Sequence, residues 1–149
     1  MIVRTASPED LAAISEMGER FHKEAGWLDI AGFNRIDCEA SLRSMIEGAG
    51  VVLVAEDEGR IVGIAGGIFF PLYFNHAHKS GQELFLYVEP GRRDGLGGKL
   101  LAALENAARE AGCQSWIMIA LDQVAPEATG RLYRRRGYRA AEHSWIRSL

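Results

Sequence analysis

The sequence has few cysteines, no strong excess of charge of either sign and no long apolar run. Its two cysteines, Cys38 and Cys113, do not have the spacing of a metal site. Each lies in a segment with periodic apolar residues, which favours buried free thiols in a reducing cytosol over a disulfide. The formal net charge of −3 gives no indication of a nucleic-acid partner. No apolar run approaches the ~18–20 residues of a membrane span, and no signal peptide precedes Ser7. We therefore expect a cytoplasmic protein without a metal or a nucleic-acid or membrane partner.

The length and composition are those of one soluble domain. The chain has 149 residues, of which 48% are hydrophobic and 25% are charged. That length allows one hydrophobic core of ordinary size. We therefore expect a single domain over residues 1–149.

Hydrophobic periodicity and turn residues predict the order of the elements. We expect strands over residues 2–6, 51–56, 61–70, 84–88, 113–121 and 138–149. Helices are expected over residues 7–26, 37–47, 96–112 and 126–137, and the loops that separate them include residues 27–36 and 71–81. Within the third strand, Gly63, Gly66 and Gly67 predict bulges or close backbone approach. The order β-α-α-β-β-β-α-β-α-β predicts an α/β (α+β) fold, a mixed sheet with helices on both faces.

The sequence of residues 83–101 predicts a strand, a glycine-rich turn and a helix. Pro90 cannot donate to a sheet ladder and marks the end of the strand, and apolar residues fall at helical spacing from Leu96 onward. A glycine-rich turn that enters a helix exposes backbone N–H groups at the positive end of the helix dipole, which is a phosphate site. A Walker A loop is excluded because Leu100 follows Lys99, and the third glycine of a dinucleotide fingerprint is absent because that position is also Leu100.

The motif resembles the acetyl-CoA signature of the GNAT superfamily, the acyl-CoA-dependent N-acyltransferases. The matching residues are Val88, Pro90, Arg92, Gly95, Gly97, Leu100 and Leu101. The family usually has two residues between the proline and the arginine, whereas this chain has only Gly91. Either Arg92 or Arg93 therefore fills the arginine position. The resemblance implies a centrally splayed sheet and acetyl-CoA as co-substrate.

The resemblance also implies which residues bind the coenzyme. The free backbone edge near Leu86, Tyr87 and Val88 would pair with the pantetheine arm and supply an oxyanion donor. The turn and the first helical turn would bind the phosphates through Arg92, Arg93, Asp94, Gly95, Leu96, Gly97, Gly98 and Lys99.

Acetyl transfer to an amine needs a proton acceptor, an oxyanion donor and a proton donor around one carbon. Tyr133 stands in a Leu-Tyr motif where the family commonly places the tyrosine that reprotonates the CoA sulfur, although an asparagine common seven residues earlier is Pro126 here. Glu83 begins the strand on which the family often places an acidic residue, and we expect it to accept the amine proton. Alternative acceptors are His22, Glu24, His76, His78 and Asp122, and in this family the two loops with Trp27, Phe33, Tyr73 and Phe74 line the acceptor pocket.

These residues predict an acyltransferase, an acetyl-CoA-dependent N-acetyltransferase. It would move the acetyl group to a primary amine of a small molecule by direct transfer in a ternary complex, because neither cysteine has a base beside it in the pattern. The alternatives are a protein or peptide N-acetyltransferase and a non-catalytic acyl-CoA-binding module. The chain has room for little more than one strand after its last helix, so completion of the acceptor end by a second subunit, as a homodimer, is a further alternative.

Overall fold

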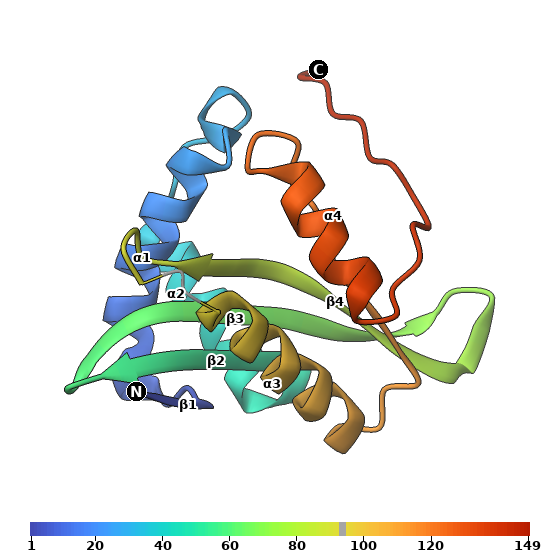
Figure 1. The fold of residues 1–149 in the computed structure, drawn as a ribbon, viewed down its shortest axis with the longest axis horizontal. Coiled ribbons are helices and arrows are strands. Elements are labelled where there is room, and N and C mark those ends of the chain that lie inside the picture. The colour runs from blue at the N-terminus through green and yellow to red at the C-terminus, as the bar shows by residue number, and fades with distance from the viewer. Residues whose placement is uncertain (93–94) are drawn as a thin grey trace.

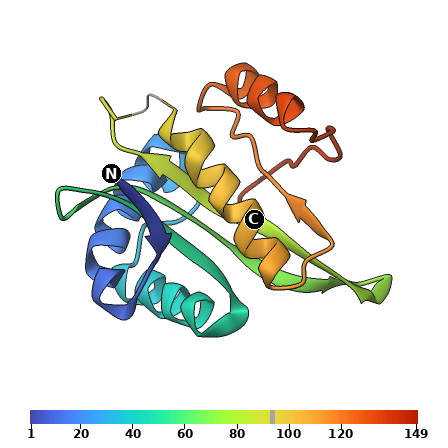
Figure 2. The same ribbon diagram turned by 60° about the horizontal axis from the view of Figure 1, so that its bottom comes forward.

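The computed structural model describes residues 1–92 and 95–149, so the predicted coenzyme ligands Arg93 and Asp94 lie outside the described residues. A mixed sheet in the order β1-β2-β3-β4-β5 forms the middle of the molecule. The helices α1 and α2 cover one face, and α3 and α4 lie on the other (Figures 1 and 2). The predicted fold class is confirmed.

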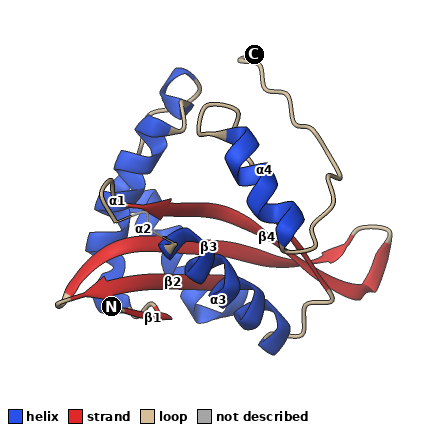
Figure 3. Cartoon of the chain, in the orientation of Figure 1, coloured by secondary structure: helices blue, strands red, loops and turns tan. Residues whose placement is uncertain are grey.

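Five strands and four α-helices are present in the described part of the chain (Figure 3). The strands are β1 (Ile2–Thr5), β2 (Gly50–Asp57), β3 (Arg60–Leu72), β4 (Asn75–Val88) and β5 (Ser115–Ile117). The helices are α1 (Leu11–Glu24), α2 (Arg35–Ser44), α3 (Leu96–Glu110) and α4 (Pro126–Arg135). Neighbouring strands from β1 to β4 are antiparallel, and β4 and β5 are parallel. No helix in these ranges is long and apolar enough to cross a bilayer.

Two hydrophobic clusters hold the helices on the sheet, one on each face. The first cluster includes Ile14, Met17, Leu42, Val52, Val54 and Tyr87. The second cluster includes Leu53, Val62, Val88, Leu96, Leu100 and Leu104. Successive residues of β2 alternate between the two clusters because side chains along a strand point to opposite faces. This two-sided burial explains the continuous apolar run in that strand.

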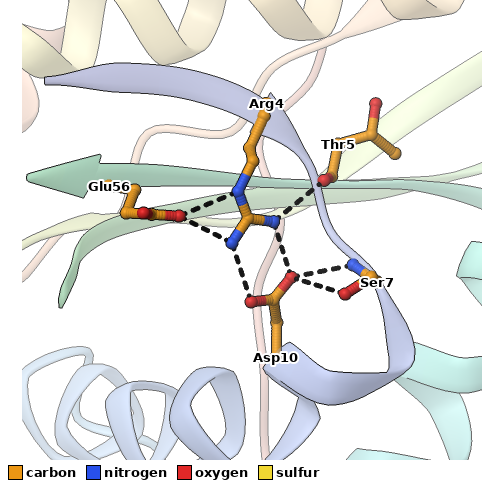
Figure 4. A network of polar contacts seen from close by, with 5 residues as sticks. All are labelled: Arg4, Thr5, Ser7, Asp10 and Glu56. Carbon is orange, nitrogen blue, oxygen red and sulfur yellow. Dashed lines mark hydrogen bonds and ion pairs between the residues drawn. The ribbon is translucent and has the colours of Figure 1, made fainter. Parts of the chain in front are cut away.

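The network around Arg4 fastens the first strand to the start of the first helix (Figure 4). The Arg4 guanidinium donates to the carboxylate of Glu56 on β2 and to both carboxylate oxygens of Asp10. Asp10 also accepts a hydrogen bond from the backbone N–H of Ser7 at 2.8 Å, which is one half of a capping box at a helix N-terminus. The hydrogen bonds from Arg4 lower the pKa of Asp10 to about 2.

The predicted loop over residues 71–81 is wrong. β3 and β4 continue through it as a long hairpin, with Pro71 opposite Lys79 and only a short turn at Tyr73 and Phe74. The hairpin extends beyond the helices (Figure 1). The backbone hydrogen bonds between two strands do not require one face of the strands to be buried. Apolar periodicity therefore does not reveal this part of the strands.

The predictions for the end of the sheet also need correction. The apolar run from Trp116 to Leu121 forms a strand only as far as Ile117. That residue is 40% exposed, so the strand is not buried on both faces. The predicted last strand over residues 138–149 does not form, and Trp145 is 94% exposed. A strand needs a partner edge, and β5 offers an edge only three residues long.

Candidate active site

A β-bulge bends β4 at the centre of the sheet. Gly66 of β3 pairs with Phe85 and Gly67 pairs with Glu83, so Leu84 is an extra residue on β4. A side chain on Gly66 would overlap the Phe85 ring, which explains why this position is glycine. Bulges bend a strand and increase its twist. The bulge predicted from these glycines is therefore confirmed.

The bulge places Glu83 on the opposite face of the sheet from Phe85. Phe85 packs against the first hydrophobic cluster, on the side of α1 and α2. Residues paired across two strands have their side chains on the same face. Gly67 pairs with Glu83, and a Cβ on Gly67 would contact Trp116, which packs against the second cluster. In a regular strand, residues two apart would share one face. The extra residue therefore turns the Glu83 carboxyl away from an apolar cluster and toward the side of α3 and α4.

β4 and β5 separate directly beside Glu83. β5 pairs with β4 only over residues 80–82, and beyond Gln82 the ladder between them ends. On its other side β4 continues to pair with β3 through Val88. The two parallel strands thus diverge from Glu83 onward, along the stretch that contains Leu86, as a splayed sheet requires.

Glu83 is a buried carboxyl with one hydrogen bond from the main chain. Glu83 is only 5% exposed. Its Oε2 atom accepts a hydrogen bond from the backbone N–H of Ile119 at 3.0 Å. Burial raises the pKa of the Glu83 carboxyl to about 7, and the hydrogen bond from Ile119 acts in the opposite direction. A carboxyl that titrates near neutral pH suits a proton acceptor.

Tyr133 and Glu83 both form hydrogen bonds with the main chain of Ile119. The Tyr133 hydroxyl donates to the carbonyl oxygen of Ile119 at 2.7 Å. Burial, followed by the negative charge of Glu83, raises the pKa of Tyr133 above its ordinary range, so the phenol keeps its proton at neutral pH. The structure therefore brings the two predicted catalytic side chains to the two polar groups of one residue. Sequence reasoning missed Ile119 because it contributes only main-chain atoms.

The described residues leave open space above the N-terminus of α3. Gly95 caps the helix with a left-handed conformation, φ 75°, which glycine adopts without strain. Among the described residues, a Cβ on Gly97 would meet only Leu86 Cδ2, at 3.8 Å, and one on Gly98 would meet no atom within 4 Å. Neither glycine is required by packing, and glycine weakens a helix by ~1 kcal/mol relative to alanine. The space suits close approach of a phosphate to the backbone N–H groups.

The cations around this turn differ in their partners. Arg92 donates to the Asp57 carboxylate at 2.5 Å, and both side chains are partly exposed. Exposed ion pairs contribute little net energy, so a phosphate can compete for this arginine. Lys99 is exposed at the first turn of α3. Arg136 is engaged by Glu105 of α3, which ties the end of α4 to that helix.

The alternative proton acceptors make other contacts. His22 donates from Nε2 to the Ala31 carbonyl, and Glu24 accepts from the Tyr87 hydroxyl at 2.9 Å. His78 bonds to Ser115, while His76 and Asp122 are exposed side chains. None of these contacts involves Glu83, Ile119 or Tyr133. Across residues 1–92 and 95–149 no cluster of three His, Cys, Asp or Glu side chains could hold a metal ion.

An apolar pocket of about 390 Å³ lies on the other face, between α1, α2 and the bulge of β4. Trp27 and Phe33, from the loop that the resemblance assigns to the acceptor, both line it. Tyr73 and Phe74, from the second such loop, contact each other edge to face at the hairpin tip and are 91% and 71% exposed. Of the two loops, only the first therefore contributes to this pocket.

The sequence model of the acetyltransferase (GNAT) domain matches residues 48–140. The chain belongs to the GNAT superfamily. It is thus an acetyltransferase, and acetyl-CoA is the donor that such enzymes use. A search of curated proteins gave no match.

Solved structures share the fold over nearly the whole chain. A predicted acetyltransferase with acetyl-CoA from Clostridium acetobutylicum superposes with a TM-score of 0.77 at 20% identity, covering 99% of this chain and 95% of that chain. A ribosomal-protein-alanine N-acetyltransferase from Brucella melitensis gives 0.71 at 16% identity, with 100% of both chains covered. An aminoglycoside acetyltransferase from an uncultured soil sample gives 0.73 at 19% identity, covering 99% of this chain and 97% of that chain.

Proposed function

We propose that this GNAT acetyltransferase moves the acetyl group of acetyl-CoA directly to a primary amine of a small molecule, in a ternary complex within one domain. The observation that carries the proposal is the arrangement around Ile119. Its N–H donates to Glu83 and its carbonyl accepts from Tyr133, beside the point where β4 and β5 diverge. A candidate proton acceptor and a candidate proton donor are therefore held together at the mouth of the splayed strands.

The coenzyme would occupy the splay and the turn before α3. The open space above Gly97 and Gly98 supports a pyrophosphate seated on the helix N-terminus, with Arg92 and Lys99 as neighbouring cations. The pantetheine arm would follow the backbone of β4 through the stretch that contains Leu86. This placement brings the thioester toward Glu83 and Tyr133.

The chemistry would proceed in two linked proton transfers. Glu83 accepts a proton from the ammonium group, and the free amine attacks the thioester carbon. A backbone N–H of β4 within residues 86–88 stabilises the oxyanion until the C–S bond breaks. Tyr133 then donates its hydroxyl proton to the departing sulfur and regains a proton from the nitrogen that becomes the amide. Glu83 returns its proton to solvent after the products leave. Protonated Glu83 no longer carries the charge that raises the pKa of Tyr133, so the first transfer makes the second easier.

The cysteines do not favour an acetyl-enzyme intermediate. Burial raises the pKa of both Cys38 and Cys113, so their thiols are protonated at neutral pH. Cys113 Sγ lies 3.6 Å from the carbonyl oxygen of Ser80. A protonated thiol is a weak nucleophile, which supports direct transfer.

The test combines binding with turnover. Calorimetry should show acetyl-CoA binding, and a thiol-release assay with a panel of amines should show coenzyme A formed together with an N-acetylated product by mass spectrometry. Varying both substrates should give intersecting initial-rate lines for a ternary complex, whereas parallel lines would indicate an acetyl-enzyme. A protein that binds acetyl-CoA but acetylates no amine would be a binding module. Turnover confined to peptide N-termini or lysines would identify a protein acetyltransferase.

A further inference from the structure

The helix that carries Tyr133 has no buried face. No residue of α4 is buried, and the structure describes all of this helix. By contrast, five residues of α3 are buried against the sheet. Most of the stability of a helix in a protein comes from packing of an apolar face. The position of α4 on the molecule therefore depends on its polar contacts.

Side-chain hydrogen bonds join α4 and the turn after it to other described parts of the chain at two places. The first is the bond from the Tyr133 hydroxyl to the carbonyl of Ile119. The second is Glu105 of α3, which accepts from Nε and Nη2 of Arg136 at 3.0 and 2.6 Å and from the Tyr138 hydroxyl at 3.0 Å. The Glu105 side chain is only 12% exposed. A bidentate pair between arginine and a carboxylate fixes geometry as well as adding energy, so this contact can orient the end of α4.

Tyr138 connects Glu105 to Tyr133. The N–H of Tyr138 donates to the carbonyl of Tyr133 at 3.0 Å. This bond belongs to a Schellman motif, in which Gly137 has the left-handed conformation, with φ 89°. The rings of Tyr133 and Tyr138 also lie 5.6 Å apart. The residue that Glu105 holds therefore contacts Tyr133 through both its backbone and its ring.

Glu105 lies on the helix whose N-terminus is the proposed phosphate site. The residue before it, Leu104, is fully buried in the second hydrophobic cluster. Glu105 follows the first residue of α3, Leu96, by a distance of about 14 Å along a straight helix. One well-packed helix would thus contact the coenzyme phosphates at its start and the end of α4 further along.

We propose that Glu105 is a positioning residue for acetyl transfer, which sets where the Tyr133 hydroxyl lies relative to the coenzyme sulfur. It does so by holding Arg136 and Tyr138 at the C-terminal end of α4. The inference rests on the proposed role of Tyr133 as the proton donor. Because α3 would also seat the phosphates, the coenzyme and its proton donor are aligned by the same helix. A misplacement of about 1 Å can reduce the rate of an enzyme ~10²-fold.

Four variants separate this role from a general effect on folding. Glu105→Ala removes the acceptor of both contacts, and Glu105→Gln is the conservative variant because its amide oxygen can still accept a hydrogen bond. Arg136→Met breaks the ion pair from the side of α4 and leaves the bond from Tyr138. Glu110→Ala is the matched control, since Glu110 is an exposed carboxylate of α3 whose side chain has no hydrogen bond or ion pair with a described residue.

The first measurement is hydrogen–deuterium exchange of residues 126–138 in the complex with coenzyme A, followed by mass spectrometry. Exchange should be faster in Glu105→Ala and Arg136→Met than in the wild type, and unchanged in Glu110→Ala. The second measurement is steady-state kinetics with the fastest amine of the panel. Glu105→Ala should lower kcat by at least about tenfold at unchanged KM for acetyl-CoA, and Glu105→Gln should recover part of that loss.

A double variant shows whether Glu105 acts through Tyr133. In the Tyr133→Phe background, Glu105→Ala should lower kcat by less than about twofold, because the group that it positions is already absent. Losses that multiply in the double variant would overturn the inference, as would unchanged exchange of α4 in Glu105→Ala. Full kcat in Glu105→Ala, where Tyr133→Phe is slow, would overturn it while the proposed reaction stands. Full kcat in Tyr133→Phe would instead refute the proposed proton donor, and the inference with it.

Discussion

The buried Glu83 carboxyl should make the stability of the wild-type protein fall as the pH rises. Its pKa is about 7 in the folded chain, compared with 4.5 for an ordinary glutamate. Between these values the folded chain holds a proton that the unfolded chain releases, so the free energy of unfolding decreases with pH across this interval and then levels off. At about 1.4 kcal/mol per pH unit, the interval amounts to about 3 kcal/mol.

Replacement by glutamine removes this dependence. In Glu83→Gln the amide oxygen can still accept from Ile119, and any cost of its buried N–H groups is the same at every pH. The unfolding free energy of the variant relative to the wild type should therefore rise by about 2–3 kcal/mol between pH 5 and pH 8. Urea titrations at constant ionic strength, followed by circular dichroism, measure this difference.

Glu105→Gln is the matched control, because its environment acts in the opposite direction. The hydrogen bond from Arg136, together with that from Tyr138, lowers the pKa of Glu105. That carboxyl is ionised in both the folded and unfolded chains above pH 5, and its contribution is lost only as the pH falls through its folded pKa. Glu105→Gln should therefore destabilise the protein by a nearly constant amount between pH 5 and pH 8.

Activity supplies the second half of the test. Loss of a general base typically reduces the rate by ~10²–10⁴-fold, and wild-type kcat/KM should rise with pH through about 7 as Glu83 ionises. If the stability difference between Glu83→Gln and the wild type were the same at every pH, the argument from burial would be refuted. A variant with the expected stability change and full activity would show that Glu83 is buried but is not the base.

Three further substitutions test separate parts of the structure. Tyr133→Phe should lower kcat by ~10²–10⁴-fold at unchanged coenzyme A affinity, measured well below Tm because the carbonyl of Ile119 loses its donor; wild-type kcat would refute the role. Gly97→Leu should weaken coenzyme A binding by at least about tenfold in calorimetry, whereas Gly97→Ala should raise the stability of α3; unchanged affinity in the leucine variant would remove the motif from the site. Arg4→Met should destabilise the protein by about 2 kcal/mol at pH 7 in urea titrations, and the difference from the wild type should shrink below about pH 4 as Asp10 is protonated; a difference that persists at pH 2 would contradict the assigned pKa.

The parts of the fold predicted correctly are those that short stretches of sequence determine. The end of β4 and the start of α3 follow from Pro90, the glycines and an apolar repeat, all within about twenty residues. The bulge was predicted because Gly66 and Gly67 are unusual inside a strand, and the structure shows the rings and carbonyls that leave no room for a side chain there. In each case a local residue type has one physical explanation.

The errors concern pairing between distant segments. An apolar run such as Trp116 to Leu121 has the composition of a buried strand, but a strand forms only where a partner edge lies beside it. β4 turns away from β5 after Gln82, so the run loses its partner after Ile117. The segment after α4 then has almost no edge to join. This divergence opens the proposed coenzyme site, so the failed strand predictions and the candidate function have the same structural cause.

The candidate site depends on a feature that no single residue in β4 reveals. Period-two alternation predicts Glu83 on the same face as Phe85 and Tyr87, among apolar side chains where a carboxylate would lack a partner. The extra residue Leu84 reverses that prediction and directs the carboxyl to the N–H of Ile119. The signal for the reversal lies on the neighbouring strand, in the glycines that permit the close approach. A carboxylate in a strand is therefore best assigned to a face only after its partner strand has been checked for a bulge.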